Sequence, residues 1–432
     1  MNIKFYNLGK IRETELDLRP LTVIIGPNNS NKTYIAYSVY ALWERLGSSE
    51  IEAGEEDFQP LPTDIFSQLS EHQKEYIPLD LGNFFQDSSH KLFDNTKLNF
   101  NISKEEIEEN LKKLFDRRKQ QSSRNIPVIP GLDPDFMGDE DIIVEDIDIS
   151  KLLFPTPLAL PAERNTLILT YKLLSNRRYK LMKDTQRQIF SHRGFNKNDI
   201  DLVKAQSIGY PQPIEDFLDF LTDVEMAREP DAGPEFRKLA DDIEQQMQER
   251  NKVYLEPVKL GGKEIRIRVK QGLDIDLYNA SSAIRQLTPL ILYLRYRAKI
   301  NDFIVIDEPE MNLHPESQAK LLEVFGIMIS LGVRILITTH SPYLLAHLNN
   351  LVSGAVETPE ILREQAASSY LKDPRAFLSM DQVSAYEMKN DKLHSLKDED
   401  YGIRWDTLSD VSSDIQQKYF EIHEKKEIGE EG

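Results

Sequence analysis

The sequence predicts an α/β protein, with a mixed sheet flanked by helices and a helix-rich insertion inside this core. Strand-like runs alternate with helical patterns at both ends of the chain, as parallel sheets require. Two runs lead into polar residues: Leu21–Ile25 enters a loop of small and Asn residues, and Ile304–Ile306 ends in two carboxylates. Because α/β proteins bind ligands at the carboxyl ends of such strands, the same runs predict a site.

The N-terminal segment contains a phosphate-binding loop. Strands expected at 3–8 and 15–18 precede it, and its plan is Gly, four residues, Gly, Lys, Ser/Thr, with Asn31 in the second glycine position. Backbone N–H groups in such a loop point at phosphate, Lys32 supplies charge for the β- and γ-phosphates, and the Thr33 hydroxyl binds Mg²⁺. Asn tolerates unusual backbone angles, so the loop can form. The predicted phosphate-binding residues are Gly26, Pro27, Asn28, Asn29, Ser30, Asn31, Lys32 and Thr33.

The middle of the chain differs in composition and hydrophobic pattern from the two ends. This difference predicts an insertion, which is mostly helical. We expect two parts of a head domain, 1–49 and 252–432, separated by this insertion at 50–251, which carries a core segment near 150–167. Its expected elements are a helix at 104–118, an acidic loop at 131–148, buried-strand character within 152–167 ending in Ala-Glu-Arg, and helices at 166–183 and 213–250.

The C-terminal part returns to alternating strands and helices. Short β-rich runs are followed by a capped helix, the acidic strand, a further helix and two more apolar runs. The expected elements are strands at 253–258, 264–269 and 273–277, a helix from about 281 to 296, and strands at 304–307, 333–337 and 383–388, with a terminal helix at 411–425.

The acidic strand is the most informative segment, and 304–314 reads IVIDEPEMNLH. Two carboxylates beside an apolar strand need a compensating positive charge nearby, and hydrated Mg²⁺ is the usual one. Asp307 then holds the metal through its water shell, and Glu308 orients an attacking water. Taken alone, the segment could equally be a helix N-terminus that carries acidic residues.

Two further segments converge on the same edge of the sheet. Ser281 or Ser282 is expected to cap a helix whose free N–H groups form a second phosphate-binding end. The run ILITTHSP delivers His340 to the carboxyl end of its strand. A capped helix or a lone His is usually structural, but their order beside the other two motifs favours a functional role for both.

Composition limits the alternatives. The chain has 432 residues, 40% of them hydrophobic, and no Cys, which excludes disulfides, thiolate metal sites and Cys nucleophiles. The formal charge of −19 does not favour nucleic acid as a partner, although 112–124 and 172–193 are rich in Lys and Arg. With neither an apolar signal core at the start nor a run long enough to span a bilayer, we expect a cytoplasmic protein with no membrane partner.

The ordered motifs resemble the ABC-type ATPase heads of the SMC, RecF and OLD-like proteins. The matching residues are about 1–46 and 252–350, with Pro-Ala-Glu-Arg at 161–164 as a looser match. The phrase EPEMNLHPESQ is most like the stand-alone ATPase subunits of bacterial anti-phage systems of the Septu and PARIS type. The resemblance implies an ABC-ATPase head with a P-loop NTPase fold.

Residue roles follow from this resemblance. It implies ATP and Mg²⁺ as cofactors, with 28–33 on the phosphates, Asp307 on Mg²⁺, Glu308 activating water and His340 sensing the γ-phosphate. It also implies that 279–283, with Ser281, Ser282 and Ala283, is a signature turn that closes over ATP held by a second copy, so a homodimer is the minimal active unit. Glu163 or Arg164 occupies the region where such heads carry a closing glutamine.

The chain departs from the resembled pattern at two glycines. Asn31 replaces one in the P-loop and Ala283 replaces one in the signature turn, and each adds a side chain where the backbone approaches phosphate. These departures predict slow turnover more than weak nucleotide binding.

Three functions remain open at this stage. The first is a nucleotide-controlled sensor or scaffold that holds or activates a separate effector in anti-phage defence. The second is a RecF-like DNA-binding repair ATPase that uses the basic segments. The third is an OLD-like ATPase with its own nuclease site, for which only the acidic stretches 131–148 and 398–402 are candidates.

Overall fold

The computed structural model describes most of the chain outside the middle segment. The described residues are 1–47, 75–77, 84–85, 96–101, 153–174, 210–258, 262–269, 272–355, 358–398, 402–404 and 417–418.

Six strands form the central sheet, in the order β13-β12-β3-β11-β10-β6. Neighbouring strands from β12 to β6 run parallel, whereas β13 is antiparallel to β12, so the sheet is mixed, as predicted. Their bounds are β3 Leu21–Ile25, β6 Leu158–Leu160, β10 Phe303–Asp307, β11 Arg334–Thr339, β12 Val383–Lys389 and β13 Lys392–Ser395.

The register of the three inner strands brings their carboxyl ends to one level. Thr338 of β11 pairs with Ile24 of β3 on one side and with Asp307 of β10 on the other. Thr339, the last residue of β11, pairs with Ile25, the last residue of β3. The residues that follow these strands therefore begin at the same edge of the sheet.

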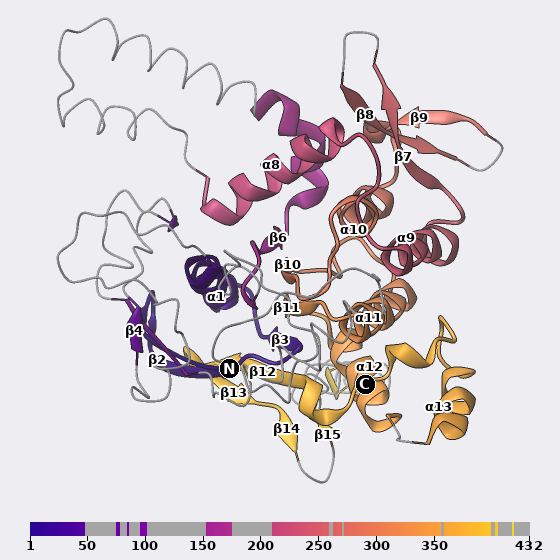
Figure 1. The fold of residues 1–432 in the computed structure, drawn as a ribbon. Helices are drawn as coiled ribbons and strands as arrows, with labels where there is room; N and C mark the ends of the chain where they lie inside the picture. The colour runs from indigo at the N-terminus through magenta and orange to yellow at the C-terminus, as the bar shows by residue number, and fades with distance from the viewer. Residues whose placement is uncertain are drawn as a thin grey trace, which may run out of the picture.

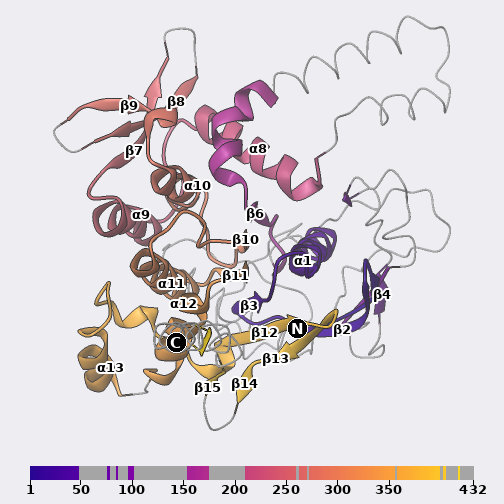
Figure 2. The same ribbon diagram turned by 180° about the vertical axis from the view of Figure 1, so that it is seen from behind.

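Different layers cover the two faces of the central sheet (Figures 1 and 2). Phe303 and Val305 pack in one core with α1 and a four-stranded antiparallel sheet of order β2-β1-β5-β4. Ile304 and Ile306 point the opposite way, into a second core formed with α10, α11 and α12. The bounds are β1 Asn2–Leu8, β2 Ile11–Asp17, β4 Glu75–Ile77, β5 Lys97–Asn101, α1 Lys32–Gly47, α10 Ser282–Tyr296, α11 Pro315–Ser330 and α12 Pro342–Ser353.

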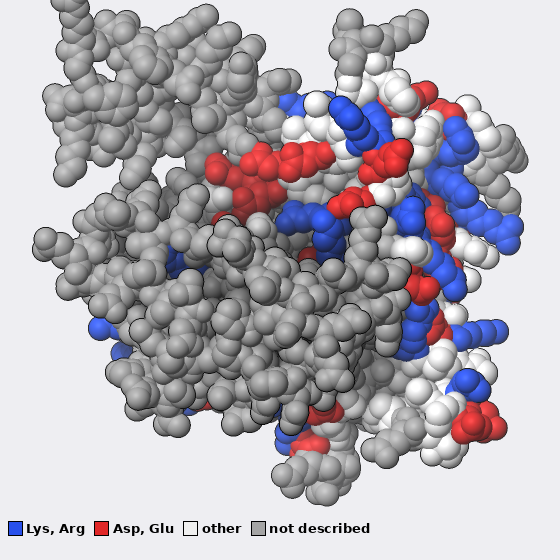
Figure 3. All heavy atoms as spheres, in the orientation of Figure 1, with Lys and Arg blue, Asp and Glu red and all other residues white. Residues whose placement is uncertain are grey.

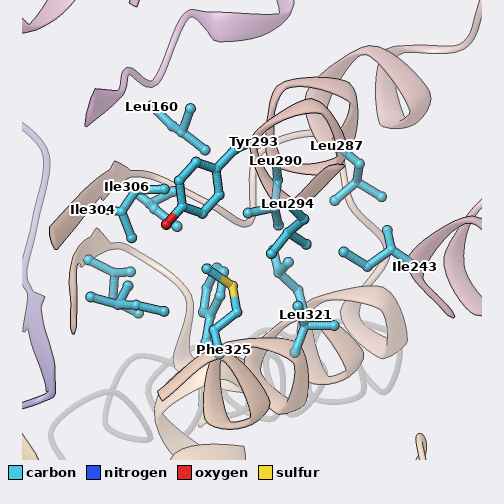
Figure 4. Close-up of a cluster of buried hydrophobic side chains, with 14 of the residues drawn as sticks. Leu160, Ile243, Leu287, Leu290, Tyr293, Leu294, Ile304, Ile306, Leu321 and Phe325 are labelled. Carbon is cyan, nitrogen blue, oxygen red and sulfur yellow. The ribbon is translucent and has the colours of Figure 1, made fainter. Parts of the chain in front are cut away.

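The second core fixes α10 against the acidic strand. Figure 4 shows Tyr293, Leu290 and Leu294 of α10 in one cluster with Ile304 and Ile306 of β10. All five side chains are at most 4% exposed. Burying each is worth about 1.5–3 kcal/mol relative to leaving it in water. The helix that carries the predicted signature turn is thus held by the strand that carries Asp307.

The remaining elements lie around this core. The helix α8 contacts β6, α9 contacts α10, and β7, β8 and β9 form an antiparallel sheet. A helix also covers 164–174 in the described residues. The other bounds are α8 Gln212–Met226, α9 Pro234–Met247, β7 Lys252–Pro257, β8 Lys263–Arg268, β9 Asp274–Asp276, α13 Pro359–Ala366, β14 Lys397–Asp398 and β15 Gly402–Ile403, with 3₁₀ turns η2 Leu277–Asn279, η3 Pro374–Ala376 and η4 Met380–Gln382.

The structure confirms the predicted strands of the core. It corrects one predicted helix, at 213–250, and the predicted extent of strand character at 152–167. The helix expected at 213–250 is two helices, because Pro230 and Pro234 with the intervening small residues cannot continue α8. The strand character expected over 152–167 survives only in β6, since Pro155 and Pro157 precede it and Pro161 follows it. The strand expected at 15–18 begins earlier, at Ile11.

Several expectations concern residues that the structure does not describe. The helix at 104–118, the acidic loop at 131–148 and the basic stretch at 112–124 lie outside the described residues. The same holds for most of 172–193 and of the terminal helix at 411–425. Within the described ranges, none of the helices combines the length and apolarity that crossing a bilayer requires.

Gly326 of α11 is a packing constraint that can be tested. A Cβ atom on Gly326 would lie 2.2 Å from the carbonyl oxygen of Ala376, which is backbone and cannot rotate away. We expect Gly326→Ala to lower the free energy of unfolding by about 1–3 kcal/mol in urea denaturation, despite the better helix propensity of Ala. Gly233→Ala is the control, because its Cβ would make only an ordinary 3.7 Å contact with Phe236. Equal stability of the two variants would contradict this packing.

Candidate functional site

The P-loop connects β3 to α1 and takes the backbone conformation that its sequence demands. Asn29 and Asn31 have φ of 59° and 65°, the left-handed region that Asn tolerates. A Cβ atom on Gly26 would lie 2.9 Å from the Met388 carbonyl oxygen of β12, so only glycine fits there. The Asn31 side chain lies near the β1–β2 turn, and its buried Nδ2 atom has no hydrogen-bond partner among the described residues.

Lys32 is buried inside this loop. Its ammonium group donates to the carbonyl oxygens of Gly26 (3.1 Å) and Pro27 (2.8 Å) and lies 3.4 Å from the Ser30 hydroxyl. Burial lowers the pKa of Lys32, and the nearby carboxylates of Glu308, Asp307 and Glu310 act in the opposite direction. The loop therefore holds a cation at the start of α1, facing the acidic end of β10.

Asp307 is held by hydroxyl groups from the two neighbouring chain segments. The Thr33 hydroxyl lies 3.1 Å from Asp307 Oδ2, and the buried Thr338 hydroxyl donates to Oδ1. Burial raises the pKa of Asp307; the hydrogen bond from Thr338 opposes this, and the negative charge of Glu308 adds to it. A carboxylate and a hydroxyl at this separation are oxygen donors of the kind that Mg²⁺ takes together with phosphate and water, so this pair fits the ion.

His340 touches both charged partners of the site. Its Nε2 atom lies 3.1 Å from Lys32 Nζ and 3.1 Å from Glu308 Oε1. Nε2 either accepts from the ammonium or donates to the carboxylate, so the tautomer of the imidazole ring selects between the two contacts. Both the His340 and Glu308 side chains are about one third exposed, 27% and 30%. They form the open side of the site.

Glu310 fixes the end of β11 from the loop after β10. Its Oε1 atom accepts from the His340 backbone N–H (2.6 Å) and the Thr339 hydroxyl (2.7 Å). Its Oε2 atom is buried and finds no hydrogen-bond partner in the part of the chain that the structure describes. Glu310, the third acidic residue of the Asp-Glu-Pro-Glu run, thus fixes the position of the backbone that carries the His340 side chain.

A buried Arg164 lies beneath the acidic residues. Its guanidinium donates to the carbonyl oxygens of Asp307 (2.7 Å) and Glu308 (3.1 Å), and its Nε to that of Gln286 (3.3 Å). Burial lowers the pKa of Arg164 to about 10, so the group remains charged at neutral pH. The neighbouring Glu163 is exposed and takes no part in these hydrogen bonds.

The predicted signature turn forms the N-terminus of α10. Ser281 is the N-cap, and its hydroxyl accepts from the Ile284 backbone N–H at 3.3 Å. Ser282 and Ala283 begin the helix. Among the described residues, no hydrogen bond or ion pair joins these three residues to the P-loop; α10 reaches the site through Gln286 and Arg164.

The structure thus brings together most of the residues that the motifs single out. The P-loop residues, Asp307, Glu308 and His340 share one edge, whereas no hydrogen bond or ion pair among the described residues joins 281–283 to them. Sequence reasoning assigned no role to Thr338 or Glu310 and left Arg164 ambiguous. Each lies in a motif, Thr-Thr-His, Asp-Glu-Pro-Glu or Pro-Ala-Glu-Arg, and each of those motifs lies at the carboxyl end of a buried strand.

A family model and several solved structures resemble the chain. The family model described as "AAA ATPase domain" matches residues 1–345. A comparison with curated proteins gave no match.

Three of the similar solved structures are SMC heads. One is an SMC head bound to the C-winged helix domain of ScpA (12% identity, TM-score 0.35, covering 91% of this chain and 96% of that chain). Another is an Smc head with an extended coiled coil, bound to the C-terminal domain of ScpA derived from Pyrococcus furiosus (12% identity, TM-score 0.34, covering 96% of this chain and 98% of that chain). The third is the SMC head domain from Thermotoga maritima (12% identity, TM-score 0.33, covering 91% of this chain and 97% of that chain). TM-scores this low do not establish a shared fold.

Proposed function

The chain belongs to the AAA ATPase domain family, and from that premise we propose that it is a slow ABC-type ATPase that controls a separate effector protein in anti-phage defence. One observation carries the ATPase part: Lys32, Thr33, Asp307, Glu308 and His340 converge on one edge of a parallel sheet. The motif resemblance to stand-alone ATPases of anti-phage systems supports the defence part.

The P-loop binds the phosphates of ATP. Backbone N–H groups of 28–33 point at the phosphate oxygens, and Lys32 leaves the loop carbonyls to neutralise the β- and γ-phosphates. Thr33 and Asp307 would hold Mg²⁺, which would supply charge stabilisation for the transferred phosphoryl group. The buried Asp307 carboxylate is already oriented, because the Thr338 hydroxyl donates to it.

Glu308 is the residue that acts on water. Its carboxylate is partly exposed beside Lys32 and His340, so it can accept a proton from a water aligned with the γ-phosphate. His340 contacts both Glu308 and Lys32, so a γ-phosphate that draws Lys32 away removes one of the two partners of Nε2 and leaves Glu308 as the other. These contacts support the sensing role of His340.

Two variants separate binding from hydrolysis. We expect Glu308→Gln to bind ATP with near-native affinity while its kcat falls by about 10²–10⁴, the usual contribution of a general base. We expect Lys32→Ala to lose ATP binding, because it removes the side-chain charge aimed at the phosphates. Titration calorimetry and phosphate release measure the two quantities. Wild-type turnover by Glu308→Gln would move the base elsewhere, and tight ATP binding by Lys32→Ala would contradict the P-loop assignment.

The active unit in this proposal is a homodimer. The turn at 279–283 serves the ATP of a second copy; among the described residues, Ser281, Ser282 and Ala283 make no hydrogen bond or ion pair with the P-loop of their own chain. Tyr278, directly before this turn, is 66% exposed, and Tyr343, three residues after His340, is 56% exposed. Exposed aromatic side chains beside a functional edge are common at protein interfaces.

Slow hydrolysis follows from the two replaced glycines. Asn31 adds a side chain with a buried Nδ2 atom to the loop, and Ala283 adds a half-buried methyl group to the first turn of α10. Catalysis depends steeply on the position of phosphate, water and partner groups, whereas most of the binding charge from Lys32, Thr33 and Mg²⁺ is retained. A long-lived ATP-bound dimer can keep an effector in check until a trigger arrives.

Restoring both glycines tests this reading. We expect Asn31→Gly combined with Ala283→Gly to raise steady-state turnover by about 3- to 10-fold with little change in ATP affinity, because the backbone can then approach phosphate more closely. Each single variant is the matched control for the pair. An unchanged or lower rate would mean that the structure accommodates both side chains locally.

The predicted insertion at 50–251 is the element that we assign to effector or trigger recognition. Its described parts contact the head at several points: β5 pairs with β1, β6 pairs with β10, and α9 contacts α10. In Figure 3, acidic side chains gather over α8, and on the same face the described Lys and Arg residues alternate with Asp and Glu. Such mixed charge favours a protein partner over nucleic acid, which selects a continuous basic surface.

Deleting the acidic stretch 131–148 separates recognition from catalysis. We expect the deletion to leave ATP hydrolysis nearly intact, because it lies outside every segment that forms the ATP site. Co-purification with an effector encoded by a neighbouring gene should weaken. Replacing the acidic residues of 131–148 by their amides is the length-matched control for charge. Undiminished capture by the deletion variant would assign recognition to the head surface.

A further inference from the structure

One buried charge has no part in the chemistry proposed above. Arg164 is 3% exposed and begins the helix that follows β6. Figures 1 and 2 show β6 beside β10, with α10 close to both. A guanidinium is costly to bury unless its donors are satisfied, so what it binds at this junction is informative.

Most of its described hydrogen bonds go to backbone carbonyl oxygens. Arg164 binds those of Asp307 and Glu308 at 2.7 and 3.1 Å, that of Gln286 at 3.3 Å, and that of Pro161 at 2.9 Å. The Gln286 amide, turned so that its oxygen faces the guanidinium, accepts from Arg164 as well. A planar fork of five N–H donors can join three segments in this way, whereas a lysine ammonium cannot.

The carbonyls that Arg164 binds belong to a strained turn. Glu308 has φ of 45°, a left-handed conformation that is unfavourable for a non-glycine residue. Its N–H donates to Thr338 O at 3.0 Å, so the guanidinium and β11 hold the residue from both sides. The Glu308 carboxylate reaches His340 only because the backbone leaves the strand in this direction.

We propose that Arg164 is a positioning residue that fixes the Glu308 carboxylate relative to α10. The inference rests on the proposed ATPase function. Because α10 carries the turn that faces a second copy, movement of its N-terminus changes the position of Gln286, then of the guanidinium, and then of the Glu308 backbone. Arg164 therefore couples closure of the dimer to alignment of the group that activates water.

The conservative variant Arg164→Lys tests this role, since it keeps the charge and removes the fork. We expect kcat to fall by about 10- to 100-fold, while the affinity for ATP measured by calorimetry, with Mg²⁺ and with EDTA, stays within about threefold of wild type. Arg295→Lys is the matched control, because Arg295 lies in α10 and bonds to Glu244, Asp241 and Val253 away from the site. Its turnover should equal that of wild type.

A double-mutant cycle distinguishes positioning from a general loss of structure. In the Glu308→Gln background, Arg164→Lys should lower the residual rate by less than about twofold, because the group it positions is already gone. A second multiplicative loss, or a parallel loss of ATP affinity, would overturn the proposal. If Arg164→Lys does not fold, Gln286→Met decides, with an expected fall in kcat of about 3- to 10-fold and unchanged affinity.

The same measurements separate this inference from the function on which it rests. A wild-type protein that neither binds nor hydrolyses ATP would overturn both. A wild-type protein that hydrolyses ATP while Arg164→Lys and Gln286→Met retain its kcat would overturn only the role of Arg164.

Discussion

The site depends on one constraint, the parallel register of β11 between β3 and β10. Because Thr338 pairs with both Ile24 and Asp307, the P-loop, the acidic turn and His340 leave the sheet at one level. The same register lets the Thr338 hydroxyl bind the Asp307 carboxylate. A register shift of one residue would turn these side chains to the opposite face, so the buried cores on both faces also protect the site.

Within that frame, buried charges of opposite sign hold one another in place. Lys32 and Arg164 lie beside Asp307, Glu308 and Glu310, and burial shifts the pKa of Lys32 and Arg164 down and that of Asp307 up. Removing one member would leave its partners buried and unpaired, which costs more than a surface pair.

The sequence was most informative where local chemistry decides structure. The apolar runs 21–25 and 304–307 are β3 and β10, and Asn31 takes the left-handed conformation that its side chain tolerates. The role of Arg164 was not predictable, because its partner carbonyls lie 143 and 144 residues away and any carbonyl looks alike in a sequence. The pairing of β5 with β1 and the break between α8 and α9 also depend on tertiary contacts and turn residues rather than on periodicity.

The central claim is that this edge of the sheet recognises the polyphosphate of a nucleotide through Lys32, the P-loop and a Thr33–Asp307 metal pair. It is tested most directly by measuring the affinity of the wild-type protein for ATP, ADP and AMP, each with Mg²⁺ and with EDTA. The account predicts that ATP and ADP bind at least about tenfold more tightly than AMP, and that Mg²⁺ strengthens ATP binding. AMP binding as tight as that of ATP, or ATP binding that is indifferent to Mg²⁺, would contradict it.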